Sequence, residues 1–165
     1  MGDVPPRAAG YHRDTKDGER EERSVDDDSP VVPDLERMDD QQARQFIEEL
    51  FSTLSAEKEY ALRHEDYAMQ MPQSGERIRG PENMREFQRA FATESTPPSI
   101  RIRRVLAREG LWVVEGVNDY GEGRVYNVVL IVELKDGKWW RDTRYYAEPF
   151  EAPEWRAHLV ERMEI

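Results

Sequence analysis

Cysteine is absent from the 165-residue sequence, which excludes disulfides, thiolate metal sites and a cysteine nucleophile. Long apolar stretches are absent as well, and the longest run, residues 128–132, is far too short to cross a membrane. The first ten residues, MGDVPPRAAG, contain no apolar core region. We therefore expect no secretory signal and predict a cytoplasmic location without a membrane partner.

Positive charge is scarce relative to negative charge, with 24 Lys and Arg against 35 Asp and Glu and a net charge of −11. Residues 1–38 and residues 39–165 are each acidic. An acidic protein repels the phosphates of nucleic acids and the headgroups of anionic lipids. We therefore expect no nucleic-acid partner.

Residues 1–38 differ in composition from the rest of the chain. They hold four prolines, two short charge clusters and few apolar side chains. Such a segment cannot bury enough surface to offset the entropy lost on ordering. The composition predicts a disordered acidic tail at 1–38 and one folded domain at 39–165.

Apolar side chains between residues 39 and 55 recur at the i, i+3, i+4, i+7 spacing of an amphipathic helix. Asp39 or Asp40 is expected to cap the start of this helix. A short helical turn is predicted for residues 57–63. A second long helix is predicted for residues 81–92, where a proline occupies the first position and costs no hydrogen bond.

Alternating side chains predict strands around and after these helices, the first at residues 67–71. Four more strands are predicted, at residues 100–108, 111–120, 124–134 and 138–147. The Asp-Gly pair at 136–137 is a strong hairpin signal, and successive hairpins predict an antiparallel sheet. Helices followed by such a sheet indicate an α+β fold. A last helix is predicted to begin at Pro153, with one apolar face formed by Trp155, Leu159 and Met163.

Two segments carry a resemblance to a known family: MPQSGERIRGPENMREF, and DGKWWRDTRYYAEPF near the end. With the element order, they resemble the SnoaL-like branch of the nuclear transport factor 2-like superfamily. The resemblance implies a cone-shaped, curved antiparallel sheet wrapped around N-terminal helices, with a pocket at its wide end. Its relatives include steroid isomerases, polyketide cyclases, limonene-type epoxide hydrolases, dehydratases and non-enzymatic association domains, so it implies little about the reaction.

The catalytic positions of these relatives carry over poorly. The general base of steroid isomerases falls on Met71, which has no proton to move, and their acid partner falls on Leu130. The charged triad of limonene-type epoxide hydrolases falls on Gly116, Asn118 and Arg144. The resemblance therefore supports neither of the two best-understood reactions.

Strand alternation places one set of side chains on a common face, which the resemblance makes the inner face of the cone. We predict that this set binds a small apolar molecule, because a mostly apolar lining with few polar groups is typical of small-molecule sites. The predicted ligand-binding residues are Tyr67, Met69, Met71, Trp112, Asn118, Tyr126, Leu130, Trp140 and Tyr146.

Three charged side chains are candidates for catalysis. Asp142 and Arg144 share the predicted inner face, where the Asp would act as a general base or the Arg would hold a carboxylate or enolate. The alternative is an ion pair on a half-exposed surface. His64 is either an acid–base residue at the pocket mouth or a solvated helix-end histidine. Three scattered histidines make no metal site, so we expect neither a metal nor a cofactor.

The sequence thus predicts a SnoaL-like small-molecule pocket protein. It would bind an apolar cyclic or carbonyl-containing compound and, as an enzyme, would isomerise, cyclise or hydrolyse it. The alternative is a non-enzymatic ligand-binding domain or a homodimeric protein-association domain. A homodimer would use the opposite face of the sheet, where the alternation places Val113, Val117, Val129 and Ile131.

Overall fold

A computed structural model describes residues 33–163 of the chain, so most of the predicted disordered tail lies outside the described residues. The last part of that segment belongs to the folded domain. Leu35–Arg37 form a short 3-10 helix, η1, and the Leu35 side chain is fully buried. The Leu35 backbone N–H donates to the carbonyl oxygen of Gly137 at 3.1 Å. The folded core therefore includes residues before 39. The sequence pattern did not reveal this, because a single leucine among charged neighbours forms no recognisable apolar stripe.

The predicted helices are present with nearly the predicted bounds. They are α1 (Asp40–Thr53), α2 (Ala56–Leu62) and α3 (Pro81–Glu94). Asp39 caps α1: its side chain accepts the Gln42 backbone N–H, and the Gln42 side chain accepts the Asp39 N–H in return. None of the described helices is long and apolar enough to cross a membrane.

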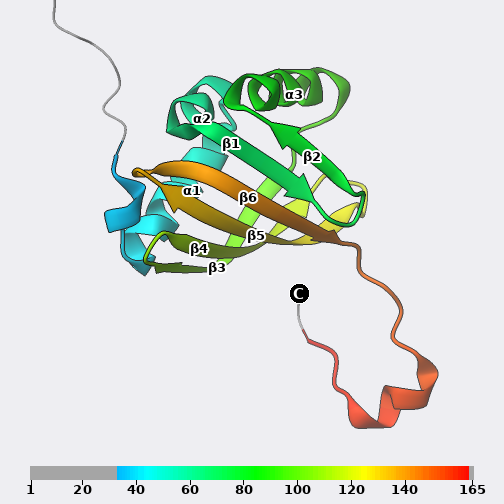
Figure 1. Ribbon diagram of the computed structural model, residues 1–165. Coiled ribbons are helices and arrows are strands. Elements are labelled where there is room, and N and C mark those ends of the chain that lie inside the picture. The colour runs from blue at the N-terminus through cyan, green and yellow to red at the C-terminus, as the bar shows by residue number, and fades with distance from the viewer. Residues whose placement is uncertain (1–32, 164–165) are drawn as a thin grey trace, which may run out of the picture. The chain divides into compact units, whose positions relative to one another are not determined.

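Six strands form one curved sheet, which with the helices gives the predicted α+β fold (Figure 1). The sheet order is β2-β1-β6-β5-β4-β3. The strands are β1 (Arg63–Met71), β2 (Glu76–Arg79), β3 (Ser99–Arg108), β4 (Leu111–Asp119), β5 (Val125–Lys135) and β6 (Lys138–Ala147).

Two features of the sheet differ from the prediction. β2 pairs with β1 in a short hairpin, although its sequence, Glu-Arg-Ile-Arg, reads as a polar turn. β1 also pairs with β6 in parallel, so the sheet is mixed rather than antiparallel. The parallel pair joins strands from the two ends of the domain, and hairpin signals say nothing about such a long-range contact.

The helices cover one side of the sheet. In Figure 1, α1 lies behind the sheet, and α2 and α3 lie together beyond β1. The core between these layers is formed by fully or almost fully buried side chains from each of them, including Ile47, Tyr67, Met69, Trp112 and Val132. Residues on the same strand faces continue past this core and line the site described below.

Trp140 does not lie on the inner face, which corrects the prediction. The pairing of β6 with β5 shifts between Glu133 and Leu134, so that Trp139 rather than Trp140 turns into the core. The Trp140 ring instead stacks against the Arg141 guanidinium, 3.8 Å from its centre. Simple alternation fails here because a bulge inserts one residue and reverses the faces.

The predicted last helix is also wrong in kind. Glu154–Leu159 form a 3-10 helix, η2, with no buried residue. Trp155, Leu159 and Met163 are 72%, 69% and 79% exposed. Although these three side chains have helical spacing, they therefore form no buried face in the part of the chain that the structure describes.

Candidate functional site

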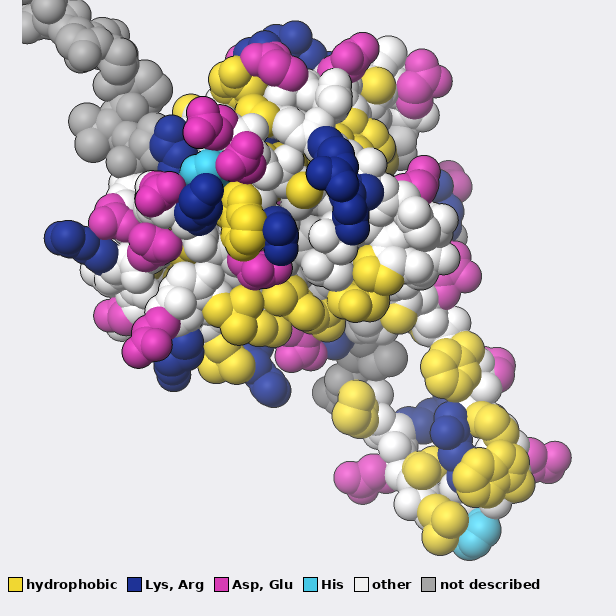
Figure 2. All heavy atoms as spheres, viewed as in Figure 1, with side chains coloured by type: hydrophobic (Ala, Val, Ile, Leu, Met, Phe, Trp, Pro, Cys, Tyr) yellow, Lys and Arg dark blue, Asp and Glu magenta, His cyan; other side chains and the backbone are white. Residues whose placement is uncertain are grey.

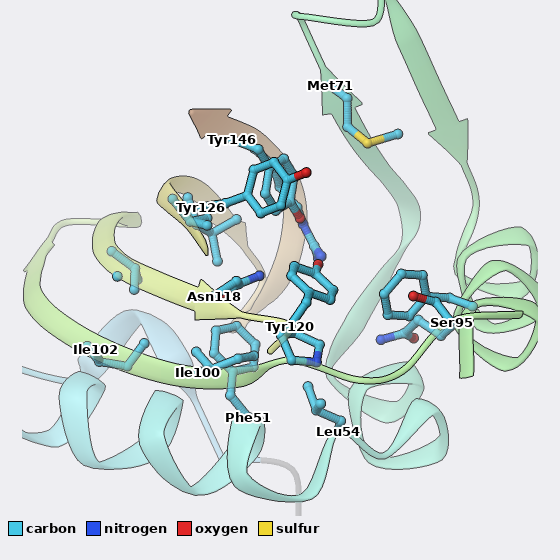
Figure 3. Close-up of a pocket in the computed structure, with 18 of the residues that line it drawn as sticks. Phe51, Leu54, Met71, Ser95, Ile100, Ile102, Asn118, Tyr120, Tyr126 and Tyr146 are labelled. Carbon is cyan, nitrogen blue, oxygen red and sulfur yellow. The ribbon is translucent and has the colours of Figure 1, made fainter. Parts of the chain in front are cut away.

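A cavity of about 410 Å³ lies between the sheet and the helices. Figure 3 shows side chains from the strands facing Phe51 of α1 and Leu54 just after its end across this space, with Met71 of β1 and Ser95 at the end of α3 at its sides. The lining is mainly apolar and aromatic, a composition typical of small-molecule sites. Its other apolar members are Phe87, Phe91, Pro98, Ile100, Ile102, Val114, Gly116, Val128 and Leu130.

Three tyrosines bring hydroxyl groups to the cavity lining. Tyr120, Tyr126 and Tyr146 lie near one another beside Asn118 (Figure 3). Tyr126 and Tyr146 belong to β5 and β6, and Tyr120 directly follows the end of β4. The rings of Tyr120 and Tyr126 meet edge to face with centres 5.7 Å apart. Burial raises the pKa of Tyr120, so this phenol stays neutral near pH 7.

Asp142 and Arg144 form a buried ion pair on β6. Arg144 donates from Nε to Asp142 Oδ1 and from Nη2 to Asp142 Oδ2, each at 3.0 Å. The hydroxyl of Tyr67, on the neighbouring strand, donates to Asp142 Oδ2 at 2.6 Å. Both oxygens of the carboxylate are therefore occupied, and Asp142 is 0% exposed.

The charges of this cluster are fixed by their surroundings. Burial alone would lower the Arg144 pKa, but the charge of Asp142, the neighbouring Tyr146 and Tyr67, and the hydrogen bond to Asp142 together raise it well above its usual value. Burial and then the charge of Asp142 raise the pKa of the Tyr67 phenol. Arg144 thus stays protonated and Tyr67 stays neutral across the physiological range.

Arg144 is the member of this cluster that reaches the cavity. Its side chain is 17% exposed and lines the cavity, whereas Asp142 and Tyr67 lie behind it. The two hydrogen bonds to Asp142 use Nε and Nη2 of the guanidinium. Its third nitrogen, Nη1, donates to no described residue. The arrangement can therefore present a charged N–H donor to an oxygen atom of a bound molecule.

A second buried ion pair reaches the same cavity from the helices. Glu59 of α2 accepts through Oε2 from Arg63 Nη2 at 2.8 Å and from Gln88 Nε2, on α3, at 2.6 Å. Gln88 Oε1 accepts from Arg63 Nη2 at 2.9 Å. Glu59 and Gln88 line the cavity, and Arg63 lies behind them with its guanidinium 5.1 Å from the ring centre of Tyr67.

Sequence reasoning missed this cluster. A Glu and an Arg four residues apart on a helix usually form an exposed pair. Here the Glu59 and Arg63 side chains are 3% and 0% exposed. The signal that could have found them is the position of Glu59 beside apolar Tyr60, Ala61 and Leu62, which marks the end of α2 as partly buried.

The predicted ligand-binding residues fall into three groups. Met71, Asn118, Tyr126, Leu130 and Tyr146 line the cavity. Tyr67, Met69 and Trp112 share the inner face but are buried in the core, each 1% exposed. Trp140, as described above, lies on the other side of β6.

His64 lies away from the cavity, which corrects the prediction that placed it at the pocket mouth. It belongs to β1, not to a helix end, and is 6% exposed. Its Nδ1 accepts the backbone N–H of Asp66 at 3.0 Å, and its Nε2 lies 3.3 Å from Asp136 Oδ2 in the β5–β6 turn. Both ring nitrogens are thus engaged in holding this end of the sheet.

Comparison with known families agrees with this geometry. A family model described as the SnoaL-like domain matches residues 43–142, which span α1 to β6. No curated protein matches the chain.

Several solved structures share the fold. A nuclear transport factor 2-like protein of unknown function from Burkholderia xenovorans LB400 is 29% identical, with a TM-score of 0.62 over 73% of this chain and 94% of its own. A proposed ketosteroid isomerase from Kribbella flavida DSM 17836 is also 29% identical, with a TM-score of 0.64 over 76% and 93%. An epoxide hydrolase-like protein from M. tuberculosis is 18% identical, with a TM-score of 0.53 over 65% and 84%, and shows likeness of fold alone.

Proposed function

Since the chain belongs to the SnoaL-like domain family, we propose that its cavity binds a small, mainly apolar cyclic compound through a carbonyl oxygen. The observation that carries this proposal is the Nη1 edge of Arg144, a charged donor held in place by Asp142 in a mainly apolar and aromatic lining. An apolar cavity of about 410 Å³ lies within the size range of ligand sites. The likeness to a proposed ketosteroid isomerase supports a carbonyl compound as the ligand class.

The charge balance of the site favours a carbonyl over a free carboxylate. Asp142 already neutralises Arg144 through two hydrogen bonds. A carboxylate buried at Arg144 would meet a guanidinium that is already neutralised, and this costs free energy. The other cation of the lining, Arg124, is exposed and lies over the Tyr120 ring. A carbonyl oxygen accepts the remaining N–H without adding charge.

The same donor defines the reactions that the site would serve. Isomerisation, cyclisation and hydrolysis of a carbonyl compound each build negative charge on an oxygen, and a preorganised guanidinium stabilises that charge. Asp142 contributes by positioning Arg144, because it has no surface in the cavity. The proposal includes no metal and no cofactor. A cytoplasmic location stays a prediction from the sequence.

The test uses a matched pair of probes on the full chain, 4-phenylcyclohexanone and phenylcyclohexane, which differ only in the carbonyl oxygen. Calorimetric titration is expected to show tighter binding of the ketone. In addition, the ¹³C resonance of the bound carbonyl should move downfield, as expected for a carbonyl that accepts a charged hydrogen bond. Equal affinity for the two probes, or no binding of the ketone, would overturn the proposal.

The matched variant carries Asp142→Asn together with Arg144→Met. It removes both charges at once, so no lone buried charge remains, and the Asn oxygen can still accept from the Tyr67 hydroxyl. Circular dichroism checks that it folds. We expect it to bind both probes with similar affinity. A ketone preference that survives in this variant would show that Arg144 is not the contact.

A second candidate function, homodimerisation, is favoured by the outer face of the sheet, the face turned away from α1. Val113 pairs with Ile131, and Val129 pairs with Tyr145, so these side chains form two adjacent apolar pairs, with Thr143 and Glu115 completing the two rows. Val129 and Tyr145 are 36% and 45% exposed. Figure 2 shows hydrophobic side chains gathered over this part of the sheet.

A second copy of the chain would cover these apolar pairs, because two curved sheets pack face to face through such side chains. Sedimentation velocity over a concentration series is expected to show a dimer for the natural chain and a monomer for Val129→Lys. A monomer at every concentration for the natural chain would exclude this role.

A further inference from the structure

Glu59 brings a carboxylate to the cavity whose hydrogen bonds are only half complete. Its Oε2 accepts two hydrogen bonds, from Arg63 and from Gln88. Its Oε1 accepts none from any described residue, although the side chain is only 3% exposed. Oε1 itself is not fully buried, so this charged oxygen remains open to the cavity that Glu59 lines. Oε1 is therefore placed to accept a hydrogen bond from a molecule in the cavity.

The neighbouring residues hold this oxygen in one place. The Glu59 side chain is fixed at Oε2 by donors from two different elements, Arg63 at the start of β1 and Gln88 of α3. Arg63 is in turn held by the Gln88 carbonyl at 2.9 Å and packs against the Tyr67 ring. A polar group that is oriented before binding loses little entropy when the ligand arrives.

The buried charges decide which kind of donor fits. Arg63 neutralises Glu59, and Arg144 neutralises Asp142, so the two buried pairs carry no net charge. A ligand ammonium group would add an uncompensated buried cation. A hydroxyl group donates to Oε1 without adding charge.

We propose that Glu59 forms the second polar contact of the ligand site and accepts a hydrogen bond from a hydroxyl group of the ligand. The ligand is then a neutral hydroxy-ketone with an apolar ring framework, its carbonyl oxygen on Arg144 and its hydroxyl on Glu59. This inference rests on the proposed function for the carbonyl end and adds the group at the other polar contact.

The experiment compares phenols with their matched ethers on the full chain. The phenol probes are 4-(3-hydroxyphenyl)cyclohexanone and 4-(4-hydroxyphenyl)cyclohexanone. Their methyl ethers and the parent 4-phenylcyclohexanone complete the set. The two phenols place the hydroxyl at different distances from the carbonyl. We expect the better-fitting phenol to bind about tenfold or more tightly than the parent, because its hydroxyl donates to a charged acceptor. We expect neither ether to bind more tightly than the parent.

The variant Glu59→Gln tests the contact itself. The position that accepts from Arg63 and Gln88 must remain an oxygen, so the amide of the new side chain turns its NH₂ group toward the cavity. The preference for phenol over ether should then fall to threefold or less. Glu57→Gln is the matched control, because Glu57 lies on the same helix but is exposed and pairs with Arg85 and Arg89 outside the cavity. It should bind every probe as the natural chain does.

The outcomes separate this inference from the function on which it rests. Parent and phenols that bind alike, with no hydroxyl preference, would overturn the role of Glu59 and leave the carbonyl contact intact. No binding of any ketone would overturn the proposed function and this inference together. The comparison of probes on the natural chain decides the question even when Glu59→Gln fails to fold.

Discussion

The hydroxyl of Tyr67 donates to Oδ2 of Asp142 at 2.6 Å, and the two residues are fully or almost fully buried. They come from β1 and β6, the parallel pair that joins the first strand of the domain to the last. One hydrogen bond therefore couples the position of the Asp142–Arg144 ion pair to the parallel seam of the sheet. Loss of this hydrogen bond should lower the free energy of unfolding and should also change the position of the Arg144 guanidinium in the cavity.

Tyr67→Phe removes this hydrogen bond while keeping the ring. Near pH 7 the variant should lose about 1–3 kcal/mol of unfolding free energy, because Asp142 Oδ2 loses a donor in a buried site. Urea denaturation measures the loss. Tyr145→Phe is the control, because Tyr145 is 45% exposed and should change little.

The same pair predicts a pH dependence with a definite sign. The folded protein raises the Tyr67 pKa above that of a free tyrosine, about 10. The stabilisation by the neutral phenol is therefore complete below about pH 10 and is lost as the pH rises further, because the unfolded chain releases this proton first. The stability gap between the natural chain and Tyr67→Phe should be constant from pH 6 to about 9.5 and narrow above it. A gap that widens at alkaline pH would contradict the assignment.

Leu35 tests where the folded domain begins. Its side chain is 0% exposed in the core beneath the β5–β6 turn, so Leu35→Ala should cost about 2–5 kcal/mol. Leu159→Ala removes the same atoms from a side chain that is 69% exposed and should leave the denaturation midpoint in place. Equal effects of the two substitutions would show that η1 is not part of the core.

Gly116 tests the tight contact between β3 and β4 at the cavity wall. A Cβ atom at this position would lie 2.9 Å from the carbonyl oxygen of Arg101, a backbone atom that cannot move aside cheaply. Gly116→Ala should therefore cost about 1–3 kcal/mol through overpacking. Thermal unfolding measures the loss. An unchanged midpoint would mean that β3 and β4 accommodate the added methyl group without a cost in stability.

The fold was largely predictable because its signals are local. The apolar stripe of α1, the proline at the start of α3 and the Asp-Gly turn each act within a few residues. The features that were missed depend on distant contacts. Leu35 is buried only because the β5–β6 turn lies over η1, and β1 meets β6 only once the whole sheet has formed.

The site was predictable only in part, for a related reason. Alternation along β4 and β5 placed Asn118, Tyr126 and Leu130 on the cavity side. It misplaced Trp140, because a bulge leaves no trace in residue type. Glu59 escaped notice because burial of a charged helix residue depends on what packs over it, here Gln88 from α3.

Arg144→Ala tests whether the Asp142–Arg144 ion pair contributes to stability as a buried pair does or only as a surface pair does. It would leave the fully buried Asp142 with the Tyr67 hydroxyl as its remaining donor, so the free energy of unfolding should fall by roughly 3–5 kcal/mol. Arg104→Ala is the control, because Arg104 is 70% exposed and its contact with Glu115 is long, at 3.6 Å. Urea denaturation should show a large shift of the midpoint for Arg144→Ala and none for Arg104→Ala.

The double variant Asp142→Asn with Arg144→Ala should recover part of the lost stability, because the uncompensated charge is gone while the hydrogen bond from Tyr67 remains. If Arg144→Ala alone were as stable as the natural chain, burial of Asp142 would not require Arg144. Arg144 would then not be the anchored donor on which the proposed carbonyl binding rests.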